Sequence, residues 1–331
     1  MNSLKTIVAW TVACVAGLAT TPLVVMGEPV SADSLVRVTA VRDAYPYWSP
    51  DGGQIVFQSD RHNHMSGGFS IYVMNADGTN VRRLTFREES DETPVWSPDG
   101  SKILFSSYIT DENNELFIMN ADGSDIVRLT SDPGRDGHQK FSPDGSTIIF
   151  NSQRDDDGQS DVTNYEIYEM DVDGSDVRRL TNFAEWDTYP SISPDGSKIV
   201  WRRVLPTGGN TASGRNSEIF TMNRDGSNPV NLTSLPAFDG YPSWSPDGSM
   251  IVFASNRAGE TGGNFHIYIM NADGSGAEKI LENDALVEDA RPIWSPDGSK
   301  ILFNRQYVAD ESSIDILILS LPERLVDKPP R

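Results

Sequence analysis

The sequence predicts an all-β protein, a six-bladed β-propeller of four-stranded antiparallel blades that is closed by the N-terminal strand completing the last blade. Three observations support this fold. The tetrapeptide Ser-Pro-Asp-Gly, preceded by a bulky apolar residue, occurs six times at intervals of 45 to 52 residues. A second turn, Asn-Ala-Asp-Gly or a close variant, follows in five copies. Short β-like stretches separate the turns, and four strands at this period are typical of a propeller blade.

The second copy shows the four strands of a repeat in order. The first strand ends at Trp96, the second is KILFSS (102–107), the third is ELFIMN (115–120) and the fourth is Arg-Leu-Thr (128–130). Asp followed by Gly suits a type I turn closed by a left-handed glycine, so the first and last strand pairs are tight hairpins. The second and third strands are almost continuously apolar, which we expect where neighbouring blades cover both sheet faces.

The two ends of the chain indicate how the ring closes. The sixth copy has no second turn and no fourth strand, whereas Val-Arg-Val-Thr at 36–39 precedes the first copy and resembles Arg-Leu-Thr. We expect this N-terminal strand to complete the sixth blade, because closure removes the open sheet edge between blades. The propeller then spans 33–321, and 322–331 is expected to be a loose tail.

The first 32 residues, 1–32, are interpreted as a secretory signal peptide. Lys5 is followed by the uncharged stretch 6–27 and then by small residues. Two alternatives stay open: an uncleaved membrane anchor, since roughly 20 apolar residues span a bilayer, and a lipid anchor on Cys14. All three place the rest of the protein outside the cytoplasm, so a periplasmic or secreted protein is expected.

Composition excludes several classes of function. With 27 Lys+Arg against 48 Asp+Glu, the net charge is −21, which argues against nucleic acid and anionic membrane surfaces as partners. Cys14, the one cysteine, excludes a disulfide scaffold and any multi-cysteine metal site. The sequence contains no serine-hydrolase, zinc-protease or P-loop motif, so no catalytic residue and no cofactor is predicted from motifs.

Aspartate recurs five positions before the bulky residue of every copy, where the first strand should approach the mouth of the central channel. These residues are Asp43, Asp91, Asp136, Asp187, Asp239 and Asp289. One hypothesis is an acidic collar that binds a cation such as Ca²⁺, or a basic or amide-rich peptide. The favoured alternative is structural, because a feature of every copy usually serves the fold: each aspartate caps a bend or pairs with an arginine such as Arg61, Arg154 or Arg257.

Five further side chains are candidates for the channel mouth. Tyrosine follows the aspartate by two positions in three copies, and in the third copy His-Gln replaces the residue pair that ends in proline elsewhere. The candidates are Tyr45, His138, Gln139, Tyr189 and Tyr241. The residues alone leave open whether the tyrosines pack against one another or contact a ligand.

The links between the second and third strands are long and differ among copies. The clearest cases are 60–70, 153–165, 202–217 and 256–265. These links leave the face opposite the tight hairpins, and variable loops on a rigid scaffold are where binding sites usually lie. We therefore expect function on this loop face and at the channel mouth.

The pattern Asp-x-x-Pro-x-Trp-Ser-Pro-Asp-Gly, with the later Asn-Ala-Asp-Gly and Arg-Leu-Thr, resembles the WD40-like repeat of TolB-type propellers over nearly all of 36–320. This resemblance implies a non-enzymatic protein of the bacterial cell envelope that binds an envelope protein or peptide, here expected as a monomer. About ten residues separate the predicted signal from the first repeat, so the N-terminal α/β domain of TolB is not expected.

Similar repeats occur in oligogalacturonide lyases, which use His and Gln to hold a metal. The alternative function is therefore a metal-assisted polysaccharide lyase or another propeller enzyme. Its candidate metal ligands are His62, His64, His138 and His266. A purely structural module is the third hypothesis.

Overall fold

The computed structural model describes residues 34–39, 42–62, 68–110, 113–155, 164–205, 216–257, 264–281, 287–307 and 310–326. The predicted signal peptide at 1–32, with Cys14, lies outside the described residues, as do His64 and the central parts of the four long links.

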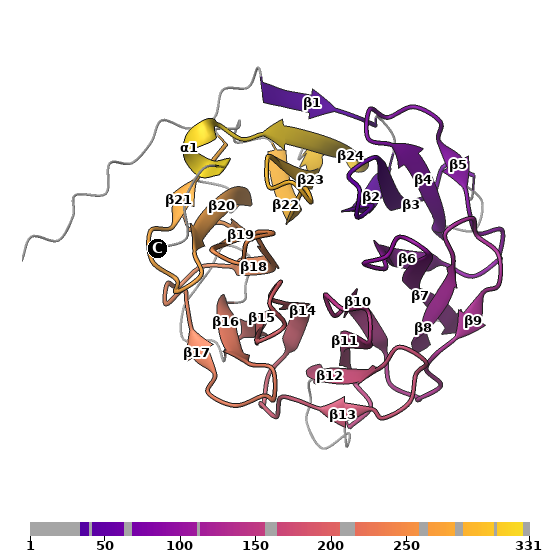
Figure 1. Ribbon diagram of the computed structural model, residues 1–331, viewed down its shortest axis with the longest axis horizontal. Helices are drawn as coiled ribbons and strands as arrows, with labels where there is room; N and C mark the ends of the chain where they lie inside the picture. Colours follow the sequence, from indigo (N-terminus) through magenta and orange to yellow (C-terminus); the bar gives the residue numbers. More distant parts are fainter. Residues whose placement is uncertain are drawn as a thin grey trace, which may run out of the picture.

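Six sheets, each of four antiparallel strands, stand around a common axis (Figure 1). The first blade is β2 (Asp43–Trp48), β3 (Gln54–Ser59), β4 (Ser70–Asn75) and β5 (Arg82–Arg83). The second is β6 (Asp91–Trp96), β7 (Lys102–Thr110), β8 (Asn113–Asn120) and β9 (Val127–Arg128). The third is β10 (Asp136–Phe141), β11 (Thr147–Ser152), β12 (Glu166–Asp171) and β13 (Arg178–Arg179).

The other three blades repeat this arrangement. The fourth is β14 (Asp187–Ile192), β15 (Lys198–Val204), β16 (Ser217–Asn223) and β17 (Val230–Asn231). The fifth is β18 (Asp239–Trp244), β19 (Met250–Ser255), β20 (His266–Asn271) and β21 (Glu278–Lys279). The sixth is β22 (Val287–Trp294), β23 (Lys300–Tyr307), β24 (Asp310–Ser320) and β1 (Leu35–Arg37). The predicted six-bladed all-β fold is confirmed.

Ring closure follows the prediction from the two ends of the sequence. Strand β1 pairs antiparallel with β24, with Val36 opposite Ile318, and so becomes the outermost strand of the sixth blade. The first described strand and the last one lie side by side in Figure 1. The sixth blade therefore combines the first described strand with the last three.

The apolar core lies between the blades, which explains why the second strands are apolar on both faces. Ile55 and Val56 are adjacent in β3, and both are fully buried. Ile55 packs with Leu302 of the sixth blade, whereas Val56 packs with Phe105 of the second blade. Because neighbouring residues of a strand point to opposite faces, each blade buries one face against each neighbour.

The tight turns need glycine for two different reasons. In the first Ser-Pro-Asp-Gly turn, Asp51 accepts hydrogen bonds from the Ser49 hydroxyl at 2.6 Å and the Gly53 amide at 2.9 Å. Gly52 there has φ of 71°, a left-handed conformation that glycine adopts without steric cost. Gly78 in the second turn combines φ of 84° with close packing, since a Cβ atom would lie 2.7 Å from the Val38 carbonyl oxygen.

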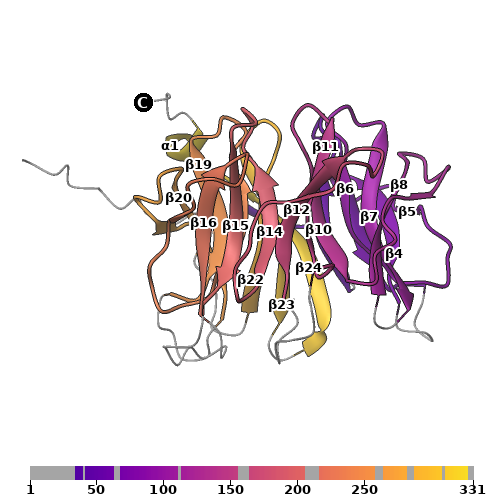
Figure 2. The ribbon, with the colours of Figure 1, turned by 90° about the horizontal axis from the view of Figure 1, so that it is seen from below.

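Each inner strand begins beside the end of the second strand, as the pairing of Asp43 with Ser59 shows. The links that enter the inner strands and those that leave the second strands therefore share one face, opposite the Ser-Pro-Asp-Gly turns. Figure 2 shows the ring edge-on, with the strands running between these two faces.

The expectation of a loose tail at 322–331 is wrong for the first part of that segment. Helix α1 (Glu323–Val326) follows β24, and its Leu325 is 1% exposed. This side chain packs with Ile280 and Leu281 of the fifth blade and Leu319 of the sixth. In the described part of the protein, no helix has the length and apolar character needed to cross a membrane.

Candidate functional site

Each inner strand carries a β-bulge at the same position, and one residue of each bulge has a left-handed backbone. In the first blade the register with β3 shifts between Ala44 and Tyr47, and the other five blades shift at the equivalent place. The left-handed residues, with φ between 50° and 56°, are Tyr45, Thr93, His138, Tyr189, Tyr241 and Arg291. For residues other than glycine, such backbone strain costs on the order of 1–3 kcal/mol each. We call these six residues the bulge ring.

Side chains of the preceding blade hold two of these bulges in place. The Tyr45 amide donates a hydrogen bond of 3.0 Å to Oδ1 of Asn304 on β23. The Thr93 amide donates one of 2.8 Å to Oε1 of Gln58 on β3. At the bulge these two amides lose the backbone acceptor that a regular strand pair would provide. The side-chain oxygens replace that acceptor and so stabilise the bulge.

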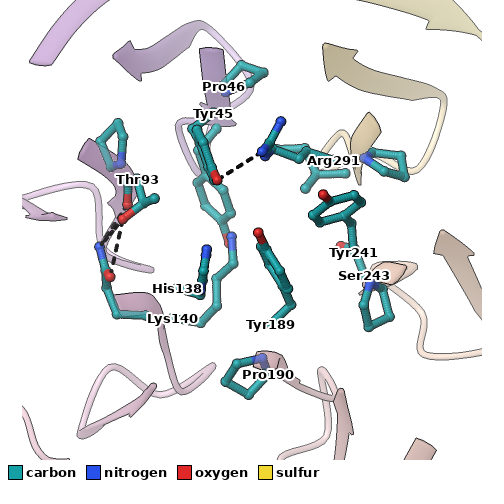
Figure 3. Close-up of a pocket in the computed structure, with 16 residues that line it drawn as sticks. Tyr45, Pro46, Thr93, His138, Lys140, Tyr189, Pro190, Tyr241, Ser243 and Arg291 are labelled. Atoms are coloured by element: carbon teal, nitrogen blue, oxygen red, sulfur yellow. Dashed lines mark hydrogen bonds between the residues drawn. The ribbon is translucent and has the colours of Figure 1, made fainter. Parts of the chain in front are cut away.

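The bulge ring surrounds a cavity on the propeller axis (Figure 3). All six members line it, together with the residue that follows each of them, and its volume is about 80 Å³. Typical small-molecule pockets are larger, roughly 300–1,000 Å³. The cavity thus has room for one side chain or the end of a peptide, but not for a folded segment.

Aromatic rings from four blades line the cavity. The Tyr189 ring lies 3.8 Å from that of His138 and 4.6 Å, edge-on, from that of Tyr241, measured between ring centroids. The Arg291 guanidinium lies 4.0 Å from the ring centroid of Tyr45 and 5.1 Å from that of Tyr241. Such cation–π geometry is attractive and is stronger away from bulk water.

His138 is neutral at physiological pH. Burial lowers the pKa of His138 to about 3, and the positive charges of Arg291, Arg202 and Lys140 act in the same direction. Its Nδ1 lies 2.8 Å from Oδ1 of Asn151. Because an amide oxygen only accepts, we assign the proton to Nδ1, which leaves Nε2 as an acceptor.

Two residues beyond the bulge ring, Lys140 also reaches the cavity. Its Nζ lies 3.9 Å from the centroid of the Tyr47 ring. Burial lowers the pKa of Lys140 to about 7 and raises the pKa of Tyr47 to about 12. The amine is therefore partly charged near neutral pH.

The six recurrent aspartates lie inside the blades instead of forming a collar at the mouth. None is more than 1% exposed, and none lines the cavity. The predicted arginine partners are confirmed: Arg61, Arg154 and Arg257 approach the carboxylates of their own blades. The distances are 2.5 Å to Asp43, 2.9 Å to Asp136 and 2.8 Å to Asp239.

The remaining three aspartates have arginine neighbours at other sequence positions. Arg203 binds both oxygens of Asp187, at 2.7 and 2.6 Å, and Arg305 binds both oxygens of Asp289 in the same way. Arg87 lies 3.6 Å from Asp91. Five of the six carboxylates thus accept hydrogen bonds from arginine, whereas both oxygens of Asp91 lack a hydrogen-bond partner among the described residues. All six are buried within the blades, so they are not presented to Ca²⁺ or to a basic peptide.

The histidine and glutamine set of a metal-dependent lyase is not brought together among the described residues. His62 bonds to the Tyr72 hydroxyl at 2.5 Å, and His266 is buried in β20. Gln139 is also buried, and its Nε2 donates a hydrogen bond of 2.7 Å to the Thr93 carbonyl. Within the described ranges, no group of three or more His, Cys, Asp or Glu side chains is placed to hold a metal.

Five residues predicted from the sequence line the cavity: Tyr45, His138, Gln139, Tyr189 and Tyr241. Among the wall residues that the sequence analysis missed are Thr93, Arg291, Tyr47 and Lys140. Thr93 and Arg291 occupy the same repeat position as Tyr45, so aligning the six copies would have found them. Tyr47 and Lys140 stand two positions later in their strands and share an equivalent position with each other.

A family model for the TolB beta propeller domain matches residues 30–108, 91–208 and 209–306. The chain belongs to the TolB beta-propeller family. A protein named "Protein TolB homolog" from Chlorobium chlorochromatii (strain CaD3) is 32% identical over 126 residues, which is 28% of this chain and 29% of that protein. An uncharacterized protein from Agrobacterium fabrum is 32% identical over 91 residues, 27% of this chain and 31% of its own length. The sequence therefore matches less than a third of the length of each of these two curated relatives.

Solved structures of TolB have the same propeller. TolB from Acinetobacter baumannii superposes with a TM-score of 0.61 and 27% identity, covering 78% of this chain and 59% of that one. A putative TolB from Agrobacterium tumefaciens has a TM-score of 0.61 and 21% identity, covering 85% and 90%. An oligogalacturonate lyase from Vibrio parahaemolyticus, at 0.57 and 15% identity over 89% and 96%, shares the fold alone.

Proposed function

We propose that this TolB-family propeller is a non-enzymatic binding protein of the bacterial cell envelope, periplasmic or secreted, which holds a protein or peptide at its loop face and channel mouth. The bulge ring carries this proposal. Aspartate stands two positions before the ring residue in all six blades, and proline directly follows the ring residue in five of them. The ring residue itself changes between blades, although each copy keeps the same strained backbone.

This contrast separates scaffold from site. The repeated aspartates are accounted for by their arginine partners inside the blades. The ring residues also contact one another across the blades, as Arg291 does with Tyr45, but their side-chain type changes from blade to blade and all of them line the axial cavity. Backbone strain of this kind is concentrated at functional sites, and tyrosine and arginine are enriched among the residues that dominate binding energy.

The dimensions of the cavity support a particular mode of binding. A volume of about 80 Å³ admits a single side chain or the end of a peptide. The partner would therefore insert one group between the tyrosines, while the rest of its surface rests on the face around the mouth. A cavity core surrounded by a wider rim is the usual anatomy of a protein interface.

Binding is favoured over catalysis because, among the described residues, no two titratable groups of the wall are paired as acid and base. The amine of Lys140, whose pKa is lowered to about 7, lies over the Tyr47 ring and not beside a second catalytic group. His138 is held neutral with a pKa of about 3, and its ring partner is the uncharged Asn151. A general base is most effective with a pKa near the working pH and within reach of a second catalytic group.

Affinity capture from envelope extracts tests the proposal. The full-length protein should enrich one defined protein, and Tyr189→Ala with Tyr241→Ala should reduce its recovery at least about tenfold, the size expected when buried aromatic contacts are lost. The matched control is Val127→Ala with Val230→Ala on the exposed outer strands, which should leave recovery unchanged. Equal loss in both variants, or no enriched protein under cross-linking, would contradict the proposal.

A further inference from the structure

The cavity wall is positively charged in a protein whose net charge is −21. Arg291 and Lys140 both line the cavity, and no aspartate or glutamate does. Within the described residues, neither cation has a carboxylate at salt-bridge distance. The blades elsewhere satisfy buried arginines with carboxylates, so the absence of such a partner in the wall sets these two cations apart.

Arg291 has unused hydrogen-bonding capacity. Its Nη2 donates to the Tyr45 hydroxyl at 3.0 Å, whereas its buried Nε has no acceptor among the described residues. Arg305, on the adjacent strand of the same blade, gives both Nε and Nη2 to Asp289. Buried polar groups are nearly always hydrogen-bonded. The Nε group of Arg291 therefore lacks the kind of acceptor that a carboxylate provides to Arg305.

Lys140 supplies a second cation to the same cavity. It projects from β10, across the axis from Arg291 on β22, and its Nζ lies 3.9 Å from the centroid of the Tyr47 ring. Burial lowers its pKa to about 7, because an ammonium ion in this position has lost water without gaining an opposite charge. An anion in the cavity would supply that charge.

Charged groups nearby do not fill this role. Glu92 precedes a bulge-ring residue and interacts electrostatically with Arg291: burial raises the pKa of Glu92, and the charge of Arg291 lowers it in part. It does not line the cavity, no salt bridge joins it to Arg291 among the described residues, and it accepts a hydrogen bond of 2.9 Å from the Ser90 hydroxyl. Arg202 lies 4.8 Å from the Phe238 ring centroid and adds positive charge. The positive charges of Arg291, Arg202 and Lys140 lower the pKa of His138, because they oppose its protonation.

We propose that the cavity binds a carboxylate of an acidic peptide, either that of an Asp or Glu side chain or that of the peptide's C-terminus, between Arg291 and Lys140. This inference rests on the proposed function, since the carboxylate is the group that the partner inserts. Arginine binds carboxylates through a rigid planar fork, and a charge-assisted hydrogen bond is about twice as strong as a neutral one. The surrounding tyrosines limit the occupant to a single small anionic group. The basic or amide-rich peptide considered from the sequence does not match this wall.

The test uses four pools of random hexapeptides passed over the immobilised full-length protein and quantified by mass spectrometry. The pools are amidated with one Glu, amidated with Gln in its place, amidated with Lys in its place, and the Gln pool with a free C-terminus. We expect the Glu pool or the free-acid pool to be retained at least about tenfold more than the Gln amide pool. The pool that leads identifies the source of the carboxylate.

Paired variants assign this preference to the cavity. Arg291→Gln with Lys140→Gln should abolish it, whereas Arg82→Gln with Lys300→Gln, which makes the same change in net charge at exposed positions, should not. Arg291→Lys should keep part of it, because the charge remains and the fork is lost. Equal retention of the Gln amide pool, preference for the Lys pool, or no retention at all would overturn the inference.

A measurement on the unaltered protein covers the case in which the paired variant does not fold. In ¹³C-lysine-labelled protein, a retained acidic peptide should raise the pKa of Lys140, and an unchanged pKa would overturn the inference. The outcome of partner capture is independent of these results. If partner capture depends on the tyrosines but the peptide pools show no carboxylate preference, this inference is wrong and the proposed function still holds.

Discussion

Arg291 donates a hydrogen bond to the hydroxyl of Tyr45 and covers its ring at 4.0 Å, although 246 positions separate the two residues. Arg291 belongs to the sixth blade and Tyr45 to the first, so their contact crosses the seam at which the ring closes. The candidate binding site and the closure of the propeller therefore share one contact.

Removing the hydroxyl at this seam should weaken the fold measurably. Tyr45→Phe keeps the ring and loses a bond to a charged donor, so we expect the free energy of unfolding to fall by about 1 kcal/mol. Tyr47→Phe is the matched control, because its hydroxyl makes no hydrogen bond within the described residues, and it should change little. Urea unfolding of both variants makes the comparison, and equal losses would argue against the seam contact.

Glycine and alanine variants should have opposite orders of stability at a bulge-ring position and at a position outside the ring. Tyr241 has φ of 56°, so Tyr241→Gly should be about 1 kcal/mol more stable than Tyr241→Ala, which keeps the strain. At Tyr47, which lies outside the left-handed region, alanine should be more stable than glycine by roughly 0.5–1 kcal/mol. Thermal unfolding of the four variants decides this, and the same order at both positions would contradict the strained-ring account.

The recurrent aspartates should matter for stability and not for binding. Arg203→Met leaves the buried Asp187 without its partner, and we expect a loss of about 3 kcal/mol. Adding Asp187→Leu removes the buried carboxylate that Arg203→Met leaves unpaired, and it should restore most of the lost free energy of unfolding. The retention of acidic peptides by the double variant should equal that of the unaltered protein. A binding defect in a stably folded double variant would restore the acidic collar as a functional feature.

Lys140 should give the protein a stability that rises with pH near neutrality. Burial lowers its pKa from 10.5 to about 7, so between these values the unfolded state binds more protons than the folded one. Stability then increases with pH, here by on the order of 1–2 kcal/mol from about pH 7 to 9. Lys140→Met should flatten this slope in thermal unfolding, and an unchanged slope would show that another group is responsible.

The same titration predicts a pH dependence of binding. Three other groups of the wall do not change charge in this range, since the pKa of His138 is about 3, that of Tyr47 is about 12 and that of Tyr189 is raised by burial. Retention of acidic peptides should therefore weaken as Lys140 loses its proton above about pH 7. Retention that grows with pH would argue against Lys140 as a ligand-binding cation.

Much of the fold could be predicted because turn chemistry repeats so regularly. Six Ser-Pro-Asp-Gly turns set the number of blades, and the strand-like 36–39 indicated ring closure. Recurrence in every copy also identified the pairing of Asp43 with Arg61 as structural. The packing of Leu325 could not be predicted, because two adjacent apolar residues, Leu325 and Val326, in a short charged segment give no periodic signal.

The charge of the channel could not be predicted because it depends on the bulge. In a regular strand, residues two apart point to the same side, so Asp43 and Tyr45 were both expected at the channel mouth. The left-handed residue breaks that alternation: Asp43 turns into the blade to meet Arg61, and Tyr45 turns to the axis. Arg291 stands at the ring position of its copy and Lys140 two positions after the ring position of its own copy, but neither residue type recurs there in another copy. The repeat pattern therefore gave the place of these side chains and not the positive charge of the wall.

Photo-cross-linking tests most directly whether the channel wall is the binding site. A photoreactive phenylalanine analogue is placed at Tyr189 in one variant and at Val127, on the outer strand, in another, and both are irradiated with the acidic peptides that the protein retains. We expect peptide adducts from position 189, centred on the acidic residue or the C-terminus, and none above background from position 127. Adducts from position 127 alone, or adducts from 189 that ignore the carboxylate, would contradict it.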